Sequence, residues 1–297
     1  MTRKNVACCK RKSTGKPPQP NSLMLALTAP IILLMLTLSS CARPDWGDAF
    51  QAQPAIVSGR QLLAAMAAEE GKCALCRDAD VKLTLKSPLK DAAASGYLLL
   101  RQPSSIKFVC SNPFGQPIFL ATSDGARFQQ LLMLQKTYRH GQVFSYLADN
   151  HLPPALALGN WGSWLSGGLG QVKVEATEIR PDRQHRGLWF AWPLPRLTKA
   201  PDIAKNDLWE HVLVDAEKRL LLARVISEGD DKTIARFDYG ERQAGKPCRQ
   251  PGEIVISGLE GGSVIRLVFS NPQTPAECPE DLFRLRKPEN FQEIYMP

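Results

Sequence analysis

The sequence contains few of the groups from which enzyme and metal sites are usually built. Only 4 of its 297 residues are histidine, and their spacing is not that of metal ligands: His140, His151, His185 and His211. It has no Gly-x-Ser-x-Gly elbow, no HExxH motif, no P-loop and no glycine-rich dinucleotide fingerprint. We therefore expect no enzymatic activity, no metal site and no cofactor.

Acidic residues are missing from the first forty positions, and this explains the positive charge of the chain. The net charge is +8, from 37 lysines and arginines against 29 acids. Six of these charges belong to the N-terminal cations, so residues 41–297 carry only +2: Arg3, Lys4, Lys10, Arg11, Lys12 and Lys16. A nearly neutral body lacks the basic footprint of a nucleic-acid-binding protein, and we expect no nucleic acid as a partner.

Long apolar runs are also scarce, and the one near the N-terminus is short. Residues 23–38 form an uncharged run of about sixteen residues, or about 24 Å of helix, whereas a spanning helix needs roughly 20 residues. Positive charge followed by a short apolar run is typical of a secretory signal peptide. We predict that residues 1–40 are such a signal.

The apolar run ends at Leu38-Ser39-Ser40-Cys41, which resembles the bacterial lipobox. In that motif the cysteine is diacylated and becomes the mature N-terminus. The resemblance implies a lipoprotein held at a membrane by two or three acyl chains, such as palmitate, on Cys41. Ala42 follows the cysteine in place of aspartate, which favours the periplasmic face of the bacterial outer membrane. The alternative is that Cys41 is an ordinary thiol after a short anchor helix.

The remaining cysteines indicate an oxidising compartment. Of the 8 cysteines, five are left after signal removal and acylation, so one stays unpaired within the chain. A bridge between Cys248 and Cys278 would clamp the predicted hairpin of residues 254–256 and 264–269. Cys73 and Cys76 form a CxxC pair, for which we expect a local structural disulfide, or pairing of one of them with Cys110, rather than redox catalysis or a zinc site.

Composition and periodicity predict one globular domain after a short tether. The chain is 44% hydrophobic and 22% charged, within the globular range. We expect a tether over residues 41–57, a helix from Ser58 to near Gly71, and short helices around Trp161 and Trp164. Alternating segments bounded by turn residues predict strands in two groups: 81–86, 96–101, 105–110, 116–122 and 127–132, then 171–176, 188–192, 210–214, 220–227, 233–239, 253–257 and 263–270.

Grouped strands favour an α+β fold with a single large, strongly curved antiparallel sheet, an incomplete barrel, and two or three helices closing its open side. The order of several motifs resembles the LolA/LolB-like superfamily of lipoprotein carriers and receptors, in particular the lipid-anchored LolB type. The resemblance covers residues 58–297 and rests on these segments: Leu98-Leu99-Leu100-Arg101-Gln102-Pro103, Asn112-Pro113-Phe114-Gly115, Ser123-Asp124-Gly125, His151-Leu152-Pro153-Pro154 and Trp164-Leu165-Ser166-Gly167-Gly168.

The resemblance implies a hydrophobic cavity that binds acyl chains of lipoproteins or lipids, and a protein that receives or inserts them at the outer membrane. A soluble periplasmic carrier would be a partner. The candidate cavity-lining residues are apolar: Leu98, Leu100, Ile106, Phe108, Ile118, Leu120, Trp161 and Trp164. These positions could instead pack as core, because one step of register would place Leu99 inside in place of Leu98 and Leu100.

The segment around Phe114 matches the protruding membrane loop of the LolB type. An aromatic ring at a turn tip suits the membrane interface, although Phe114 could also fold back into the core. The alternative function is an accessory or structural outer-membrane lipoprotein that binds a protein or glycolipid partner.

Overall fold

A computed structural model describes residues 44–88, 91–170, 178–195, 207–229, 232–240, 248 and 250–297. The predicted signal peptide, the lipobox cysteine Cys41 and the predicted strand at residues 171–176 lie outside this part of the chain. The helices, including short 3-10 turns, are α2 (Gln53–Glu70), α3 (Val143–Asp149), η1 (Pro154–Leu158), α4 (Trp161–Ser166), η2 (Glu260–Gly262) and η3 (Glu280–Phe283). None of the helices described is long and apolar enough to cross a membrane.

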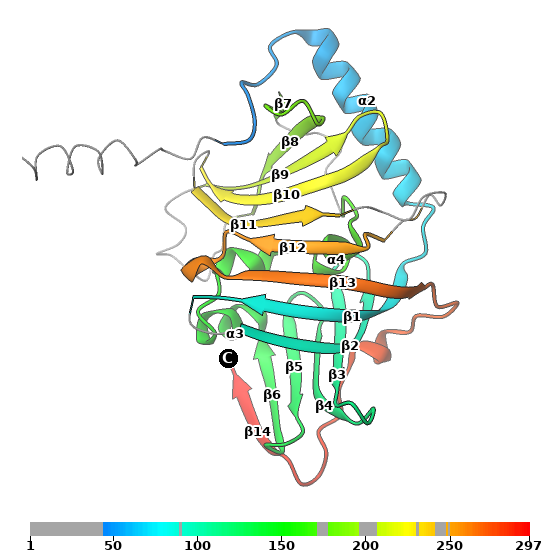
Figure 1. Cartoon of the computed structure of the whole chain (residues 1–297), viewed down its shortest axis with the longest axis vertical. Coiled ribbons are helices and arrows are strands. Elements are labelled where there is room, and N and C mark those ends of the chain that lie inside the picture. The colour runs from blue at the N-terminus through cyan, green and yellow to red at the C-terminus, as the bar shows by residue number, and fades with distance from the viewer. Residues whose placement is uncertain are drawn as a thin grey trace, which may run out of the picture. The chain divides into compact units, whose positions relative to one another are not determined.

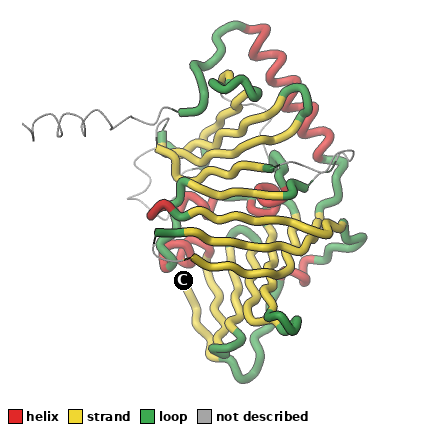
Figure 2. Tube along the Cα trace, in the orientation of Figure 1, coloured by secondary structure: helices red, strands yellow, loops and turns green. Residues whose placement is uncertain are grey.

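Strands are the main regular element of the described chain, as Figure 2 shows. The first group precedes the short helices and the second follows them: β1 (Cys76–Lys86), β2 (Asp91–Arg101), β3 (Ser105–Ser111), β4 (Pro117–Ser123), β5 (Arg127–Leu132), β6 (Thr137–Gln142), β7 (Glu178–Pro181), β8 (Leu188–Pro193), β9 (Leu208–Asp215), β10 (Leu220–Glu228), β11 (Lys232–Tyr239), β12 (Glu253–Ser257), β13 (Val264–Gln273) and β14 (Gln292–Met296).

All fourteen strands belong to one open sheet, with the order β14-β6-β5-β4-β3-β2-β1-β13-β12-β11-β10-β9-β8-β7. The two groups are meanders that meet where β1 pairs with β13, from Asp80 opposite Ser270 to Lys86 opposite Val264. In Figure 1 the strands β3 to β6 run across the direction of β1 and β13, so the sheet is strongly curved. The predicted α+β fold with a curved, unclosed sheet is confirmed.

The sheet is mixed rather than wholly antiparallel. β14 returns from the C-terminus and pairs in parallel with β6, from Gln292 opposite Thr137 to Met296 opposite Gly141. The predicted antiparallel sheet is therefore wrong at this edge. A parallel pair needs a long connection between its strands, and here most of the chain supplies it.

Alternation of side chains gives the sheet two distinct faces. We call the face that carries Leu98 and Leu100 the inner face, and the face that carries Leu99 the outer face. Helices α2, α3 and α4 bury Leu63, Leu147 and Trp164 in the same core as Leu98 and Leu100. Leu99 instead packs with Cys76 and Phe283.

The segment predicted as a tether, residues 41–57, makes specific contacts with the sheet from Pro44 onward. The ring of Trp46 is 3% exposed and stacks on His211 with 4.1 Å between ring centres. The backbone NH groups of Gly47 and Phe50 donate to Pro181 and Ile179, each at 2.9 Å. Helix α2 begins at Gln53, before the predicted start at Ser58, with proline in its first turn. Proline suits that position because its NH would be unbonded there.

A C-terminal strap, residues 274–291, crosses the outer face between β13 and β14. Phe283 packs on Leu99, and Leu285 packs with Leu131 and Tyr138. The side chain of Gln129 accepts from the NH of Leu285 at 2.7 Å and donates to its carbonyl at 3.3 Å. Both faces of the first meander are therefore covered.

Two disulfides fasten the strand β1 region to distant parts of the chain. Cys73 is bonded to Cys248 and Cys76 to Cys278, with Cα separations of 5.4 and 6.0 Å. The predicted pairings Cys248–Cys278 and Cys73–Cys76 are wrong, because the C-terminal strap carries Cys278 away from its hairpin to the outer face. Cys110 is buried and is the free cysteine of the described part.

Candidate functional site

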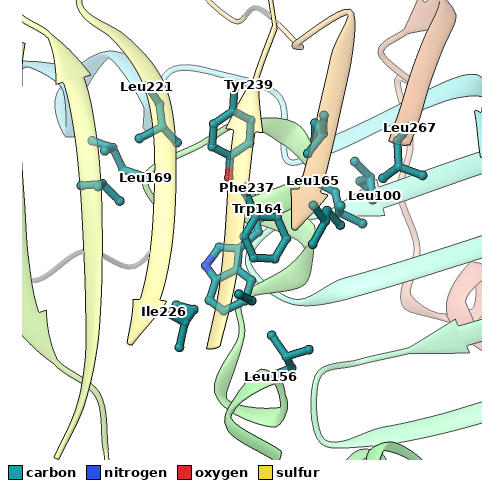
Figure 3. Close-up of a cluster of buried hydrophobic side chains, with 14 of the residues drawn as sticks. Leu100, Leu156, Trp164, Leu165, Leu169, Leu221, Ile226, Phe237, Tyr239 and Leu267 are labelled. Atoms are coloured by element: carbon teal, nitrogen blue, oxygen red, sulfur yellow. The ribbon is translucent and has the colours of Figure 1, made fainter. Parts of the chain in front are cut away.

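Helix α4 closes the inner face over the junction of the two meanders. Its Trp164 is 1% exposed, and the ring lies 5.3 Å from that of Phe237 on β11 and 5.4 Å from that of Trp161. Figure 3 shows Trp164 and Leu165 among Leu100, Phe237 and Leu267, which come from both halves of the sheet. The chain's own aromatic rings therefore occupy the place where the sequence predicts a lipid cavity.

Six of the eight predicted lining residues lie on this inner side. Trp164, Leu98 and Leu100 are in the main core, and three more pack against it: Ile106, Phe108 and Trp161. The predicted inner position of Leu120 is wrong, because Leu120 packs in the outer-face cluster of Leu131, Tyr138 and Leu285. Ile118 is half-buried and shares the strand face of Leu120, two residues away.

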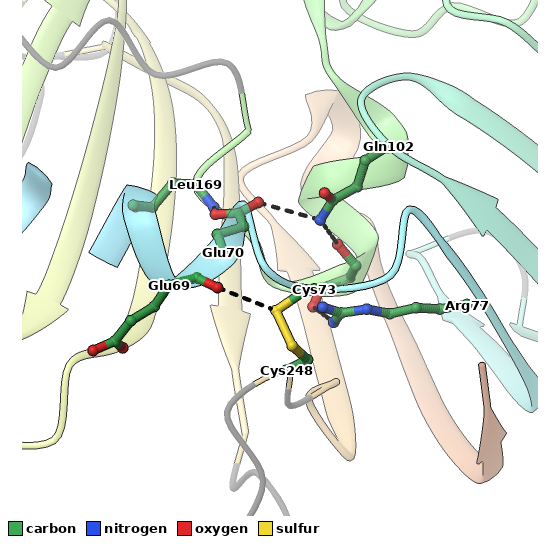
Figure 4. Close-up of a disulfide and its surroundings, with 8 residues drawn as sticks. Glu69, Glu70, Cys73, Arg77, Gln102, Leu169 and Cys248 are labelled. Atoms are coloured by element: carbon green, nitrogen blue, oxygen red, sulfur yellow. Dashed lines mark hydrogen bonds between the residues drawn. A yellow bond between two sulfur atoms is a disulfide. The ribbon is translucent and has the colours of Figure 1, made fainter. Parts of the chain in front are cut away.

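Side chains from α2, from β1 and from the residue after β2 hold α4 and the segment after it. Glu70 accepts from the backbone NH of Leu169 at 2.7 Å and from Gln102 at 3.2 Å. Arg77 donates to the carbonyl oxygen of Ser166, the last residue of α4, at 3.2 Å. Figure 4 shows these groups beside the Cys73–Cys248 disulfide. These side chains, together with the hydrogen bond from the backbone NH of Ser163 to the carbonyl oxygen of Pro103 at 2.9 Å, attach α4.

An ion pair lies on the inner face beneath α4. Arg224, which is 0% exposed, pairs with Glu210 and donates to the carbonyl oxygen of Gly168 at 2.6 Å. Burial lowers the pKa of Arg224, but Glu210, Tyr239 and Glu70 together outweigh burial, and the pKa lies above its usual value. Glu210 also accepts from the indole NH of Trp192 at 3.0 Å. The cation is therefore permanent and fixed.

Two buried donors beside this ion pair have no acceptor among the described residues. They are the indole Nε1 of Trp164 and the Nε of Arg224. The two side chains are in contact, since the guanidinium carbon of Arg224 lies 5.3 Å from the Trp164 ring centre. A buried NH without a partner costs roughly 1–3 kcal/mol, so this region favours the entry of an acceptor oxygen.

A cavity of about 690 Å³ lies on the outer face, beside the C-terminal strap. Its lining includes Arg101, Arg127 and Gln142 from the sheet ends, and Phe283 and Tyr295 from the C-terminal part. This mixed polar and aromatic lining differs from the apolar inner face. It does not suit an acyl chain, but it could accept a polar group.

The hairpin between β3 and β4 places Phe114 in solvent. The side chain is 88% exposed, so it does not fold back into the core. The side chain of Asn112 accepts from the NH groups of Phe114 and Gln116, each at 3.0 Å, and Gly115 has φ of 79°. The turn therefore has a defined backbone conformation, and the Phe114 ring at its tip is exposed to solvent.

The buried charges were missed by sequence reasoning, although a signal exists. Arg224 lies between Ala223 and Val225 in an otherwise apolar strand, and such a residue is rarely buried without a partner. Among the described residues, no three His, Cys, Asp or Glu side chains are grouped to hold a metal ion.

No protein-family model matches the chain, and a search of curated proteins finds no match. Solved structures do resemble it. A domain from Vibrio parahaemolyticus, described as a candidate outer membrane lipoprotein-sorting protein, has a TM-score of 0.50 and 11% identity, over 75% of this chain and 95% of that one. A DUF1329 family protein from Desulfovibrio piger has a TM-score of 0.52 and 10% identity, over 77% and 97%.

A LolA superfamily protein from Nitrosomonas europaea has a TM-score of 0.45 and 9% identity, over 76% of this chain and 97% of that one. At such identities the similarity concerns the fold. The chain shares its fold with the Vibrio parahaemolyticus and Desulfovibrio piger proteins, in agreement with the LolA/LolB-like fold that its sequence motifs predict.

Proposed function

We propose that this chain is a membrane-anchored lipoprotein that binds acyl chains on its inner face and receives or inserts lipoproteins or lipids at the outer membrane. The fold supports this proposal, since one structure similar to it is described as a candidate outer membrane lipoprotein-sorting domain. The lipobox at Cys41 supports the anchor and the periplasmic location. A soluble periplasmic carrier would deliver the acylated cargo.

The observation that carries the proposal is the pair of unsatisfied donors at Trp164 and Arg224. Both donors are buried in the apolar core under α4. The carbonyl oxygen of an acyl ester, or a fatty-acid carboxylate, would accept from both while its hydrocarbon chain meets leucine and phenylalanine side chains. Acylated lipids therefore match this region in both polar and apolar chemistry.

Binding requires α4 to move, because Trp161 and Trp164 fill the inner face in the structure described. An acyl chain can replace these rings with little change in buried apolar area. Sheltering sixteen carbons from water is worth on the order of 10 kcal/mol at about 0.8 kcal/mol per methylene. This gain is set against the burial that the two rings lose and the polar contacts of Glu70, Arg77 and Arg224 that hold α4 and the segment after it. The difference in fit between donor and receiver then sets the direction of transfer, without a nucleotide.

The six tryptophans allow a direct test. Trp161, Trp164 and Trp192 lie on the inner face, whereas Trp46 and Trp189 lie in an outer-face cluster and Trp209 is 6.4 Å from His211 beside them. A brominated sixteen-carbon fatty acid quenches tryptophan fluorescence at short range. In the purified full-length chain we expect it to quench a saturable part of the emission.

The Trp161→Phe/Trp164→Phe variant should lose most of that quenching, and the matched control Trp209→Phe should keep it. Undiminished quenching in the double variant, or no quenching in the wild type, would contradict acyl binding at Trp161 and Trp164 on the inner face.

The outer-face cavity favours a second candidate, an accessory lipoprotein with a protein or glycolipid partner. Its arginines, aromatic rings and amides suit a polar headgroup. Mass spectrometry of material co-purifying with the chain separates the two candidates: extractable acyl lipid supports carriage, and a stoichiometric protein or glycan without acyl lipid supports the accessory function.

A further inference from the structure

Two large apolar side chains project into solvent from hairpin tips. Phe114, between β3 and β4, is 88% exposed, and Leu134, between β5 and β6, is 87% exposed. The next most exposed large apolar residues of the described chain are Tyr295 at 62% and Leu75 at 61%. Leaving a phenylalanine and a leucine almost fully in water gains nothing for folding. These two positions therefore call for a partner.

The strand register places both tips at the same end of the sheet. β4 starts at Pro117, opposite Ser111, and β5 ends where the NH of Met133 donates to the carbonyl oxygen of Ile118 at 3.1 Å. The two hairpins are adjacent, so their centres are two strand spacings, or about 10 Å, apart. The lower end of the sheet in Figure 1 is formed by these turns.

The Leu134 turn is fixed as firmly as the Phe114 turn. The NH of Lys136 donates to the carbonyl oxygen of Met133 at 3.3 Å. The NH of Gln292 donates to the carbonyl oxygen of Lys136 at 2.9 Å. The start of β14 thus supports this turn. Leu134 is held outward by an ordered backbone.

The charge around the tips is positive. The turns at residues 112–116 and 133–136 contain no acid, and Lys136 is exposed. The neighbouring end of the strap adds Arg286 and Lys287, against Glu289 and Glu293. Lys287 pairs with Glu293 at 2.8 Å, so the charged groups left exposed are Lys136, Arg286 and Glu289, with a net charge of +1.

We infer that Phe114 and Leu134 together form a two-pronged foot that enters the surface of a bilayer, where Lys136 and Arg286 meet anionic headgroups. A folded protein partner would need two separate pockets at a matching distance, whereas a fluid bilayer accepts a side chain at any point. Leucine and phenylalanine flanked by lysine and arginine are the composition of interfacial anchors. The inference rests on the proposed membrane function and adds Leu134 and the two cations to it.

The described chain starts far from the foot. The carbonyl oxygen of Asp45 accepts from the NH of Arg183, just after β7, and in the sequence Asp45 follows Cys41 by four residues, a length of at most about 15 Å. From β4 to β7 there are ten strand spacings, or about 48 Å along the curved sheet. The foot therefore touches the anchoring bilayer only if the sheet lies along it, and otherwise touches a second membrane. An experiment must therefore detect contact of the foot with the anchoring bilayer and with a second membrane.

The full-length chain is reconstituted in phosphatidylcholine vesicles, and protein-free vesicles are added, with brominated lipid in both. Variants Leu134→Trp and Phe114→Trp place a reporter on each prong, and Leu75→Trp is the exposed control away from the foot. Against the wild-type spectrum, we expect both prong reporters to emit at shorter wavelength and to be quenched. The control should emit as in water.

Phosphatidylglycerol in the vesicles should increase the quenching of both prong reporters. Lys136→Gln/Arg286→Gln should abolish that increase and leave the quenching in phosphatidylcholine unchanged. A water-like emission from position 134 with quenching at position 114 would overturn the two-pronged foot and leave the proposed function intact. Water-like emission from both would remove the membrane contact altogether, while acyl binding on the inner face is judged separately by the fatty-acid titration.

Discussion

The guanidinium of Arg224 lies against the ring of Trp164, with 5.3 Å from its central carbon to the ring centre. A buried cation therefore supports the tryptophan that closes the inner face. The same guanidinium bonds the backbone after α4 and pairs with Glu210 on β9. Helix α4 and the second meander are thus joined through one side chain.

Removing Arg224 alone should lower the free energy of unfolding much more than removing Arg224 and Glu210 together. Arg224→Met leaves the Glu210 carboxylate buried without its partner, and we expect a loss of about 3–5 kcal/mol in the free energy of unfolding. Arg224→Met/Glu210→Leu removes both charges and should recover a large part of that loss. Urea denaturation of the two variants measures the difference, and equal losses would show that the pair is not coupled.

The pH dependence of stability should include a contribution from Asp182, whose side chain is 0% exposed. Burial raises the pKa of this carboxyl, but hydrogen bonds from Arg186 and Trp189 outweigh burial and lower the pKa to about 2, from 3.8. The stabilisation is therefore complete above about pH 4 and is lost as the pH falls through about 2. It amounts to roughly 2 kcal/mol.

Asp182→Asn should be less stable than the wild type near neutral pH, and the gap should narrow between pH 4 and pH 2. Chemical denaturation at several pH values gives both curves. Curves that stay parallel over this window would assign the loss to packing around Trp189 instead.

Adding one methyl group at Gly141 should detach the C-terminal edge strand β14 from β6. The carbonyl oxygen of Met296 occupies the space that a Cβ on Gly141 would need. Gly141→Ala must therefore push β14 from β6, at a cost of about 1–3 kcal/mol. Limited proteolysis should then cleave near Gln292 faster than in the wild type. Gly71→Ala, where a Cβ has ordinary contacts, is the control and should change neither property.

The central strands could be predicted from sequence because each carries its own signal. The predicted strands 127–132 and 253–257 coincide with β5 and β12. Short runs with apolar residues mark these segments, and Ser123-Asp124-Gly125 and Gly258 are turn residues next to them. β6 and β14 were not predicted, since Tyr138-Arg139-His140-Gly141 has no apolar alternation and β14 depends on pairing with residues far away in sequence.

The inner site could be predicted only in its apolar part. Alternation relates Leu98 to Leu100, but it cannot say which face is inside, and the helices on one face decide it. The error at Leu120 has the same origin, because the C-terminal strap makes the outer face apolar as well. The contacts of Arg224 and Glu70 join residues far apart in sequence, so no local pattern reports them.

The two disulfides also constrain how the protein can be made. Cys73 and Cys76 are synthesised first, and their partners follow 175 and 202 residues later. Until then the nearest thiols are their own neighbours in the CxxC pair and Cys110. Because a chain emerges from its N-terminus, an early oxidation would join the wrong sulfurs. The cell must therefore delay that oxidation or correct it, which makes the yield of this protein depend on thiol-disulfide exchange catalysts.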